Sequence, residues 1–345
     1  MKKILITSEL DDKTHEVLAK RFTVALRGRA AGESAFLSEN IMIEAINDFE
    51  PEILVISADK ISRAIIESTN SLRLIVVTRG NPVNVDLVAC KERGIMVSYT
   101  PARNANCVAE LVIAMMICSA RNLFQASEAI KDGTAAIKSK ASVVDKGNDV
   151  IWSDPELKVM PYIRFRGFDI QGKILGLIGL GSIGRKTATK AIALGMKAVV
   201  FDPYVPEEEI SKIGASCVSL ERLLSESDFV SLHAGVNKET EKMIGLEELL
   251  QMKSSAYLIN TARGALVDHD ALYEVLKSKR IAGAAVDVFY YEPIAMDDSF
   301  LKLDNFIITP HIGGASTDVI THHSEMALES ILAYCSDNEI PHKAF

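Results

Sequence analysis

Short apolar runs alternate with amphipathic segments along most of the chain. In the first hundred residues the runs occupy positions 4–6, 53–56 and 74–77, and later runs occupy positions 175–178, 198–201, 229–232, 257–259 and 284–286. A run that is apolar at every position is typical of a strand buried on both faces. Between the runs, spacings such as that of Leu272 and Leu276 predict amphipathic helices. The alternation predicts the α/β class, in which helices cover parallel sheets.

The strand pattern predicts two sheets. The first series of strands ends near Tyr99, and the second begins near Lys173. Between them, residues 108–120 are apolar on nearly every helical face, which predicts a helix buried all round, in either a domain core or a subunit interface. Residues 131–168 have a less regular pattern and predict a long excursion. Loops of this length in compact domains are commonly functional, so we treat the excursion as a candidate flap.

Composition and charge narrow the class of protein. A length of 345 residues predicts about two domains. The 38 Lys and Arg against 46 Asp and Glu give a net charge of −8, whereas proteins that bind nucleic-acid phosphates usually carry a basic excess, so we expect no nucleic-acid partner. The longest apolar stretch, residues 111–118, is far shorter than the ~20 residues that cross a bilayer, so no membrane partner is expected.

The N-terminus and the cysteines point to the cytoplasm. Residues 1–7 are basic and then apolar, but the apolar part is too short for a signal peptide and predicts a first buried strand. The 5 cysteines are scattered and form no C-x-x-C pair. This pattern predicts reduced thiols in a cytoplasmic protein, and no metal site is predicted.

A glycine motif follows the strand predicted at 175–178. Gly179, Gly181 and Gly184 have the spacing G-x-G-x-x-G, and a helical pattern follows them. In this motif the first glycine permits a tight turn, the second lets the backbone approach a pyrophosphate, and the third lets the helix pack close to the strand. The N-terminus of the helix then presents free N–H groups and a positive dipole end to the phosphates. The motif predicts a dinucleotide-binding fold.

Asp202 indicates which dinucleotide binds. It ends the next predicted strand, 18 residues after Gly184, close to the ~20 expected for the acid that binds the adenosine ribose. A carboxylate there accepts hydrogen bonds from the ribose hydroxyls and repels a 2′-phosphate, and residues 203–209 contain no Arg or Lys. The charges favour NAD(H) over NADP(H), with Asp202 as an ordinary loop acid as the alternative. Because the motif lies near mid-chain, a two-domain enzyme that holds substrate across a cleft is expected.

Three charged or titratable residues follow strands in the second half of the chain. Arg263, Glu292 and His311 each come shortly after an apolar run. The carboxyl ends of parallel strands form the edge where ligands bind in α/β sheets, so the three should lie at the same edge as the glycines. A guanidinium holds a carboxylate, an imidazole exchanges one proton, and a neighbouring carboxylate stabilises the imidazolium. Together they suit reversible hydride transfer to a 2-keto acid, although each alone has an ordinary structural explanation.

The chain resembles the D-isomer-specific 2-hydroxyacid dehydrogenases, in particular the phosphoglycerate-dehydrogenase-like members, over nearly its whole length. Four stretches carry the resemblance in the family's order, namely residues 176–184, 260–264, 287–293 and 309–314. The resemblance implies two parallel-sheet domains, Rossmann-like and flavodoxin-like, with a central cleft. The substrate domain would comprise residues 1–102 plus 313–345, and the NAD-binding domain residues 103–312.

The resemblance also implies roles for individual residues. Arg263 would bind the substrate carboxylate, His311 would act as acid and base, and Glu292 would be the partner of His311. The cofactor-binding residues implied are Gly179, Gly181, Ser182, Ile183, Gly184, Asp202, Ala234, Thr261, Ala262, Asp287 and Gly313. The substrate-binding residues implied are Arg79, Gly80, Asn81 and Asn104. A homodimer that pairs through the helix region 105–124 is expected as well.

Several departures from the family pattern bear on the substrate. The loop that receives the substrate carboxylate, residues 79–86, is two residues shorter than usual, and Pro82 removes an N–H donor from it. Where phosphoglycerate dehydrogenases use an arginine for the substrate phosphate, this chain has residues 56–60 with only Lys60 as a cation. A glyoxylate or hydroxypyruvate reductase is therefore the alternative to a 3-phosphoglycerate dehydrogenase. A non-catalytic NAD-binding regulator of the co-repressor type is another, and a formate dehydrogenase is disfavoured because those enzymes usually pair the histidine with Gln.

Overall fold

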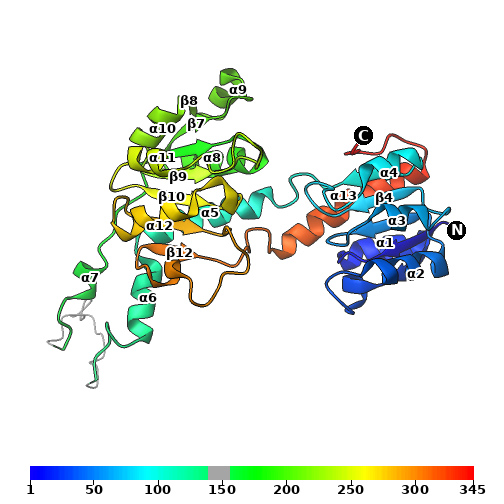
Figure 1. Cartoon of the computed structure of the whole chain (residues 1–345), viewed down its shortest axis with the longest axis horizontal. Helices are drawn as coiled ribbons and strands as arrows, with labels where there is room; N and C mark the ends of the chain where they lie inside the picture. The colour runs from blue at the N-terminus through cyan, green and yellow to red at the C-terminus, as the bar shows by residue number, and fades with distance from the viewer. Residues whose placement is uncertain (139–155) are drawn as a thin grey trace, which may run out of the picture. The chain divides into compact units, whose positions relative to one another are not determined.

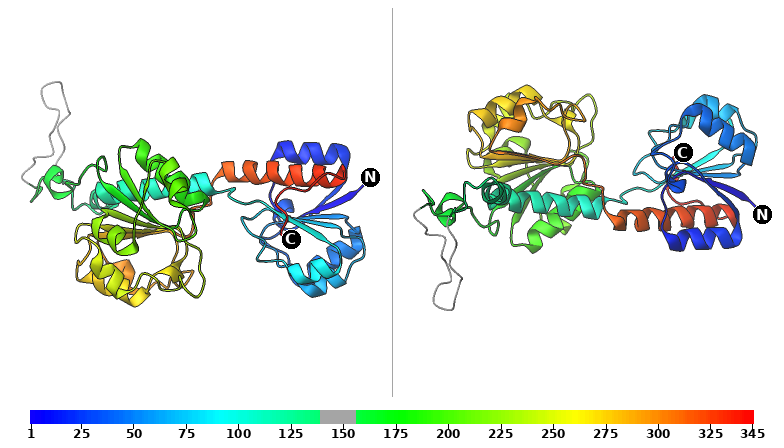
Figure 2. Two further views of the ribbon diagram at one scale, coloured as in Figure 1. Left: turned by 90° about the horizontal axis from the view of Figure 1, so that it is seen from above. Right: turned by 90° about the horizontal axis from the view of Figure 1, so that it is seen from below.

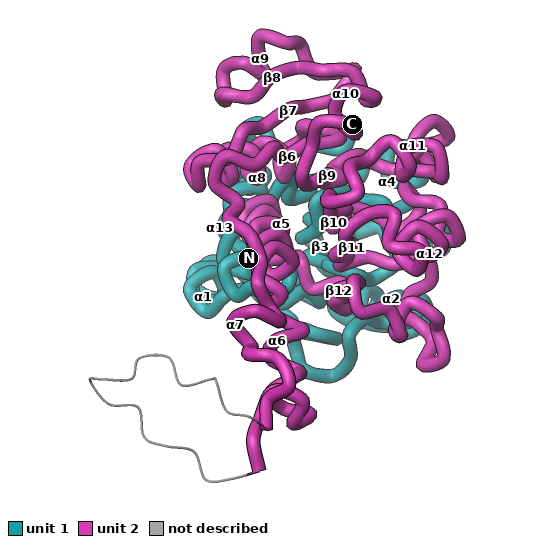
Figure 3. Tube along the Cα trace, turned by 90° about the vertical axis from the view of Figure 1, so that its left-hand side faces the viewer, with its two compact units in different colours: residues 1–104, 314–345 teal, residues 105–313 magenta. Residues whose placement is uncertain are grey.

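The structure, a computed structural model, describes residues 1–138 and 156–345. The chain folds into two compact units (Figure 3). Unit 1 comprises Met1–Asn104 and Gly314–Phe345, and unit 2 comprises Ala105–Gly313. The chain therefore passes from one unit to the other twice, after Asn104 and after Gly313. The assignment of substrate binding to unit 1 stays a prediction.

Unit 1 is a parallel sheet with helices on both faces (Figure 1). Its strand order is β2-β1-β3-β4-β5, with the bounds β1 (Lys3–Ile6), β2 (Thr23–Leu26), β3 (Ile53–Ile56), β4 (Leu74–Val77) and β5 (Met96–Tyr99). Its helices are α1 (Asp12–Arg21), η1 (Gly28–Ala31), α2 (Glu39–Phe49), α3 (Arg63–Glu67), α4 (Leu87–Glu92) and α13 (Thr317–Cys335). The strands predicted at 4–6, 53–56 and 74–77 are the three central strands.

Alternate residues of these strands build two separate cores. Ile4 and Ile6 point to the face covered by α1 and α13, whereas Leu5 points to the face covered by α2, α3 and α4. Figure 2 shows α1 and α13 side by side on one face of the sheet. Because both faces are covered, every position of β3 and β4 is buried, which explains their uninterrupted apolar sequence.

Unit 2 is built on a parallel sheet with the strand order β12-β11-β10-β9-β6-β7-β8. The strands are β6 (Ile174–Ile178), β7 (Lys197–Phe201), β8 (Ser216–Cys217), β9 (Phe229–Leu232), β10 (Tyr257–Asn260), β11 (Gly283–Val286) and β12 (Phe306–Ile308). The helices are α5 (Ala105–Ala120), α6 (Leu123–Lys131), α7 (Pro161–Arg164), α8 (Ser182–Ala193), α9 (Glu207–Lys212), α10 (Leu220–Glu226), α11 (Leu246–Gln251), α12 (His269–Lys277), η2 (Gly264–Leu266) and η3 (Ser299–Lys302). Helices α5 and α8 pack on one face, and α10, α11 and α12 pack on the other. The predicted α/β class with two parallel sheets is confirmed.

The strand order of unit 2 places a switch point at β6. The chain runs from β6 to β7 on one side and then returns to β9 on the other side of β6. In open α/β sheets, ligands bind outside the carboxyl ends of the strands at such a point. Residues 179–181, which follow β6, lie there.

Helix α5 is buried on only part of its surface within one chain, which leaves the predicted choice between a domain core and a subunit interface open. Val108, Val112, Met115 and Met116 are buried against the sheet and α8, but Ala114 on another face is exposed. Among the described residues no single helix is long and apolar enough to cross a membrane. Helices α5 and α6 reach that length and apolar content only as a pair, which is bent by 65° at the break between them.

Of the excursion predicted at 131–168, residues 139–155, including Trp152, lie outside the described residues. The described remainder contains α7, and Figure 1 shows α6 and α7 extending from the sheet of unit 2. The flap interpretation stays a prediction.

Candidate active site

The glycine loop of unit 2 has the geometry that its sequence predicts. Gly179 has φ +95°, and a Cβ on it would lie 2.8 Å from the Ala234 nitrogen. A Cβ on Gly184 would lie 2.6 Å from the Gly179 carbonyl oxygen, so helix α8 packs directly on the turn. Gly181, the N-cap of α8, has open space where its Cβ would be. A ligand can therefore approach the backbone at Gly181, beside the unpaired N–H groups of the first helical turn.

Asp202 is joined to the same loop. It follows β7, and its carboxylate accepts hydrogen bonds from the Leu180 N–H at 2.7 Å and from the Tyr204 N–H at 2.9 Å. The first bond spans two adjacent strands and fixes the glycine loop to the end of β7. An ionised carboxylate has about four acceptor positions, so two remain for ribose hydroxyls. The loop, the start of α8 (Ser182 and Ile183) and Asp202 thus fit the pyrophosphate and ribose of NAD.

His311 and Glu292 form a hydrogen-bonded pair. His311 Nδ1 lies 2.8 Å from Glu292 Oε2, and the Phe289 N–H donates to Glu292 Oε1 at 2.8 Å. Burial raises the pKa of Glu292, but the hydrogen bonds from His311 and from the Phe289 N–H outweigh it, and the net pKa lies below the ordinary value of 4.5. Since Nδ1 is held by the carboxylate, the Nε2 of His311 is the nitrogen left to exchange a proton with a substrate.

Arg263 lies at the end of β10 with its guanidinium exposed. Its Nη1 donates to the Ala262 carbonyl at 2.6 Å, and no Asp or Glu of the described chain lies within ion-pair distance of it. The Asn260 side chain, which is buried, donates to the Arg263 carbonyl and accepts from the Ala262 N–H, so it fixes this turn. A cation without a carboxylate partner, held on a rigid turn, is suited to binding an anionic substrate.

The turn of Arg263 packs directly on the segment that carries Glu292. A Cβ on Gly264 would lie 2.2 Å from the Phe289 carbonyl oxygen. The absence of a side chain at Gly264 therefore allows the two segments to meet. Sequence reasoning did not assign a role to Gly264, although a glycine directly after a charged candidate was the available signal.

Asp287 fixes the loop that carries His311. Its carboxylate is buried and accepts three hydrogen bonds, from the Thr309 hydroxyl at 2.6 Å, the Ile312 N–H at 2.8 Å and the Gly313 N–H at 2.7 Å. His311 lies between these donors and has φ +56°, in the left-handed region. The predicted contact of Asp287 with the nicotinamide stays a prediction, and the structure gives this residue a positioning contact that the sequence did not reveal.

Comparisons with known proteins place this geometry in a family. The family model for the D-isomer specific 2-hydroxyacid dehydrogenase, NAD binding domain, matches residues 113–313. A glyoxylate reductase of Korarchaeum cryptofilum is 32% identical over 339 residues, covering 98% of this chain and 94% of that protein. The chain belongs to the D-isomer-specific 2-hydroxyacid dehydrogenases.

Two further relatives show the range of the family. A D-3-phosphoglycerate dehydrogenase of Methanocaldococcus jannaschii is 35% identical over 320 residues, covering 92% of this chain and 54% of that protein. The crystal structure of the TT0316 protein from Thermus thermophilus is 31% identical, has a TM-score of 0.79 and covers 99% of this chain and 100% of that one. The predicted family, reaction class and NAD dependence are confirmed, and this dehydrogenase is an oxidoreductase that acts on the CH–OH group of 2-hydroxy acids.

The remaining cofactor candidates of the dehydrogenase surround the glycine loop and β10. Ala234 touches the Gly179 turn, as noted above, and follows the half-buried His233. Burial lowers the pKa of His233 to about 4, so this imidazole is neutral near pH 7 and its Nε2 lies 2.9 Å from the Ser231 hydroxyl. Thr261 and Ala262 lie between β10 and Arg263, and the Thr261 hydroxyl oxygen is shielded from solvent without a hydrogen-bond partner among the described residues.

The substrate-binding candidates lie in unit 1. Arg79, Gly80 and Asn81 follow β4, where the Arg79 carbonyl accepts from the Thr100 N–H at 3.0 Å. The shortened loop is also fixed by Asn84, whose side chain donates to the Ser57 and Asp59 carbonyls. Asn104 is the last residue before the chain enters unit 2, and a Cβ on Gly314 would lie 3.2 Å from its side-chain nitrogen. Contact of these four candidates with substrate stays a prediction.

Proposed function

We propose that this dehydrogenase interconverts a small, unphosphorylated 2-keto acid and its D-2-hydroxy acid, with Arg263, His311 and Glu292 as the acting residues. The observation that carries the proposal is the hydrogen bond between His311 Nδ1 and Glu292, because it leaves the Nε2 of His311 available for proton exchange. The same unit presents Arg263, whose guanidinium forms no ion pair with a carboxylate of the described chain. The names of relatives support the substrate class, since they include a glyoxylate reductase and the hydroxypyruvate reductase of Thermotoga maritima.

In this proposal each residue has one task. Arg263 binds the substrate carboxylate through two N–H groups and holds the carbonyl carbon in place. Bound NADH supplies the hydride. The Nε2 of His311 donates a proton to the carbonyl oxygen during reduction and takes it back during oxidation. Glu292, ionised at neutral pH, stabilises the protonated imidazole and sets its orientation.

We propose that Arg79, Gly80, Asn81 and Asn104 of unit 1 contribute to substrate binding. The backbone N–H groups of the loop at Arg79, Gly80 and Asn81 are suited to receive a carboxylate oxygen. The segment after β3 carries a buried acid, Asp59, which accepts from the Thr7 hydroxyl and the Leu37 N–H. An acid and a single exposed Lys60 are a poor site for a phosphate, which supports an unphosphorylated substrate.

A substrate panel tests the proposal. Oxidation of NADH is measured with glyoxylate, hydroxypyruvate, pyruvate, 2-ketoglutarate and phosphohydroxypyruvate. We expect kcat/KM to be highest for glyoxylate or hydroxypyruvate. The kcat/KM for phosphohydroxypyruvate should be lower than this highest value by about tenfold or more. Preference for the phosphorylated acid would show that the substrate class is wrong. Tight NADH binding without turnover of any acid would instead support a non-catalytic regulator.

We also propose a homodimer that pairs through residues 105–124, in the cytoplasm. The supporting observation is that α5 leaves Leu111, Ile117 and Cys118 only partly covered within one chain, and that Leu123 and Phe124 are each 48% exposed. Contiguous apolar side chains of this kind mark interaction surfaces. Cys90, Cys118, Cys217 and Cys335 form no disulfide in the described part of the chain, which supports a reducing compartment. Sedimentation should give the mass of two chains, and Phe124→Glu should give the mass of one; a single-chain mass for the unmodified protein contradicts the dimer.

A further inference from the structure

A group of charged and polar side chains lies at the carboxyl edge of the unit 1 sheet, and the proposed function uses none of them. Glu9 follows β1, Arg29 follows β2 and Arg103 follows β5. Because the strands of this sheet are all parallel, their carboxyl ends share one edge, where ligands bind in open α/β sheets. His323 of α13 contacts this group, and we call the four residues the edge cluster.

His323 holds the Arg103 side chain from the interior of unit 1. Its side chain is buried, with Nδ1 3.1 Å from Arg103 Nη1 and Nε2 2.8 Å from the Glu9 carbonyl oxygen. A guanidinium can only donate, so Nδ1 is the acceptor and Nε2 carries the proton that is donated to the carbonyl. Burial lowers the pKa of His323 below its ordinary 6.5, and the charge of Arg103 acts in the same direction, against the bond to Glu9. The ring is therefore neutral near pH 7 and accepts from Arg103.

The turn that carries Arg103 is joined to the loop at Arg79. The buried Thr100 donates both its N–H, at 3.0 Å, and its hydroxyl, at 3.1 Å, to the Arg79 carbonyl. Ala102, directly before Arg103, has φ +58°, in the left-handed region that non-glycine residues rarely adopt. Strained positions of this kind concentrate at ligand-binding sites. The turn is thus fixed beside the loop that is proposed to receive the substrate carboxylate.

The charges of the edge cluster leave Arg103 suited to an oxygen atom of a ligand. The Glu9 carboxylate is bound by Arg29, through Nε at 3.0 Å and Nη2 at 2.7 Å, so these two charges balance each other. With His323 neutral, the cluster has a net charge of +1, which is that of Arg103. A guanidinium carries five N–H donors in a fixed plane, so it can hold several oxygen acceptors at once.

We propose that Arg103 is a specificity-determining residue, which donates a hydrogen bond to a hydroxyl oxygen on C3 of the substrate. The inference rests on the proposed function and chooses between its two favoured substrates. Hydroxypyruvate has this hydroxyl, whereas glyoxylate has no C3. The substrate is only three carbons long, so a carboxylate held at the loop of Arg79 brings the C3 group close to the turn of Arg103. His323 is a positioning residue, because it holds the guanidinium and acts only through it.

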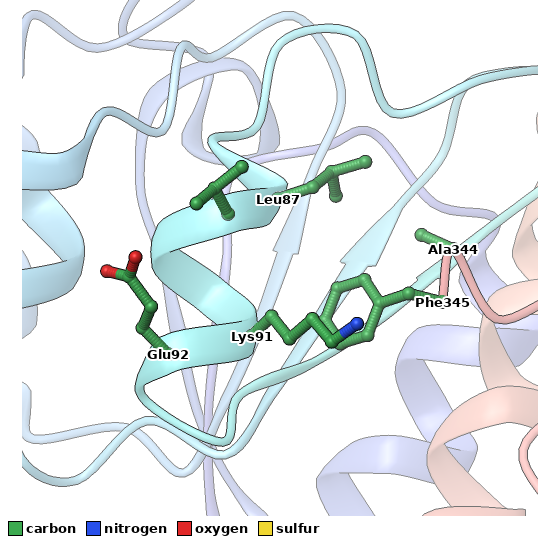
Figure 4. A pocket seen from close by; sticks show the side chains of 6 residues that line it. Leu87, Lys91, Glu92, Ala344 and Phe345 are labelled. Atoms are coloured by element: carbon green, nitrogen blue, oxygen red, sulfur yellow. The ribbon is translucent and has the colours of Figure 1, made fainter.

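A larger hollow elsewhere in unit 1 offers no comparable group. It lies between α4 and residues Ala344 and Phe345, and its volume is about 460 Å³ (Figure 4). Its lining is mostly apolar, and the two charged side chains that line it, Lys91 and Glu92, have opposite signs. None of the described residues that line it belongs to the edge cluster, and they specify no ligand.

The Arg103→Met variant tests the inference by kinetics, since methionine keeps an unbranched side chain but cannot donate. Hydroxypyruvate and pyruvate differ only in the C3 hydroxyl. We expect the ratio of their kcat/KM values to fall about tenfold or more, the change for one hydrogen bond from a charged group. The kcat/KM for glyoxylate should stay within about threefold of the unmodified protein.

Arg29→Met is the matched control, because it removes one positive charge from the same cluster, and the Arg29 guanidinium is bound to Glu9. It should leave the ratio unchanged. An unchanged ratio in Arg103→Met, or an equal fall in both variants, overturns the inference. An equal loss of activity on all three acids in Arg103→Met also overturns it, because that result indicates a general structural role.

Variants of His323 test the positioning role. His323→Leu removes the acceptor for Arg103, so the ratio should fall in the same direction as in Arg103→Met. His323→Asn keeps a side-chain oxygen that can accept from the guanidinium and should retain most of the ratio. A normal ratio in His323→Leu would show that Arg103 does not depend on this contact.

Affinity measured without turnover keeps the inference separate from the proposed reaction. D-glycerate and D-lactate differ by the same hydroxyl, and each is titrated into the NADH-saturated protein by calorimetry. We expect D-glycerate to bind about tenfold more tightly than D-lactate to the unmodified protein, and about equally to Arg103→Met. Equal affinities in the unmodified protein overturn the inference. If the difference is present but no keto acid is reduced, the inference stands and the proposed reaction is wrong.

Discussion

Replacing His311 by asparagine should lower kcat for reduction of the best keto acid about a thousandfold, because general acid catalysis contributes roughly 10²–10⁴ to such reactions. Asparagine is the informative substitution. It tolerates the left-handed φ of +56° that His311 adopts, so the loop between β12 and α13 keeps its conformation, yet it has no proton to exchange near neutral pH. NADH affinity, measured by fluorescence titration, should stay within about twofold of the unmodified protein.

The pH profile separates this chemical role from a structural one. Glu292 has a pKa below its ordinary 4.5, so its carboxylate is ionised at all higher pH values, and its support of His311 is lost only as the pH falls through that lowered pKa. Reduction by the unmodified protein should therefore lose this support only on the acid side, below pH 4.5. In His311→Asn, which has no imidazolium to stabilise, the residual rate should show no such acid loss. His322→Asn, at an exposed position of α13, is the control, and a His311 variant within tenfold of normal kcat would falsify the assigned role.

Asp287→Asn should lower both the stability and the activity. One carboxylate oxygen accepts hydrogen bonds from the Thr309 hydroxyl and the Ile312 N–H, and the other accepts one from the Gly313 N–H. The side-chain amide of asparagine has only one oxygen that can accept. Whichever way the amide turns, its NH₂ group faces a buried donor, so we expect a loss of about 2–4 kcal/mol in the free energy of unfolding. The loop of His311 is then no longer fixed, and kcat should fall about a hundredfold.

Thermal melting without cofactor tests the structural part of this prediction. If Asp287 acted only by contacting the nicotinamide, the variant would melt at the normal temperature when no cofactor is present, and only NADH binding would weaken. Asp270→Asn, an exposed acid on α12, controls for the loss of one charge and should leave the melting temperature and kcat unchanged. An Asp287→Asn protein with normal melting and normal kcat would contradict the positioning role.

The sequence predicts the buried part of the fold well and the edges poorly. The strands at 53–56 and 74–77 are covered on both faces, so every residue is apolar and the run is easy to recognise. Strand β2 lies at an edge of its sheet with partly exposed residues, and β8 has only two residues, both exposed. β8 has no apolar run, and the run in β2 is limited to residues 24–26, because little covers the side chains of either edge strand.

The candidate site also has residues that the sequence predicts and contacts that it does not. Arg263, Glu292 and His311 are predictable because chemistry-bearing residues after strands share one sheet edge, but the 2.8 Å pairing of Nδ1 with Glu292 depends on how two loops fold. The contacts of Asp287 and Gly264 are not predictable in this way. They join segments of the chain that are 22–26 residues apart, and neither spacing nor residue type indicates which donors or carbonyls will lie opposite them.

The bond from the Leu180 N–H to Asp202 has a consequence for attempts to change the coenzyme. The carboxylate that we expect to repel a 2′-phosphate also secures the glycine loop, where the pyrophosphate is expected to bind. Exchanging it for a neutral or basic side chain would remove the discrimination and loosen the phosphate cradle together, so both coenzymes would bind less well. A redesigned NADPH-using form of this enzyme would have to provide a new acceptor for that amide from a neighbouring position before a cation is introduced.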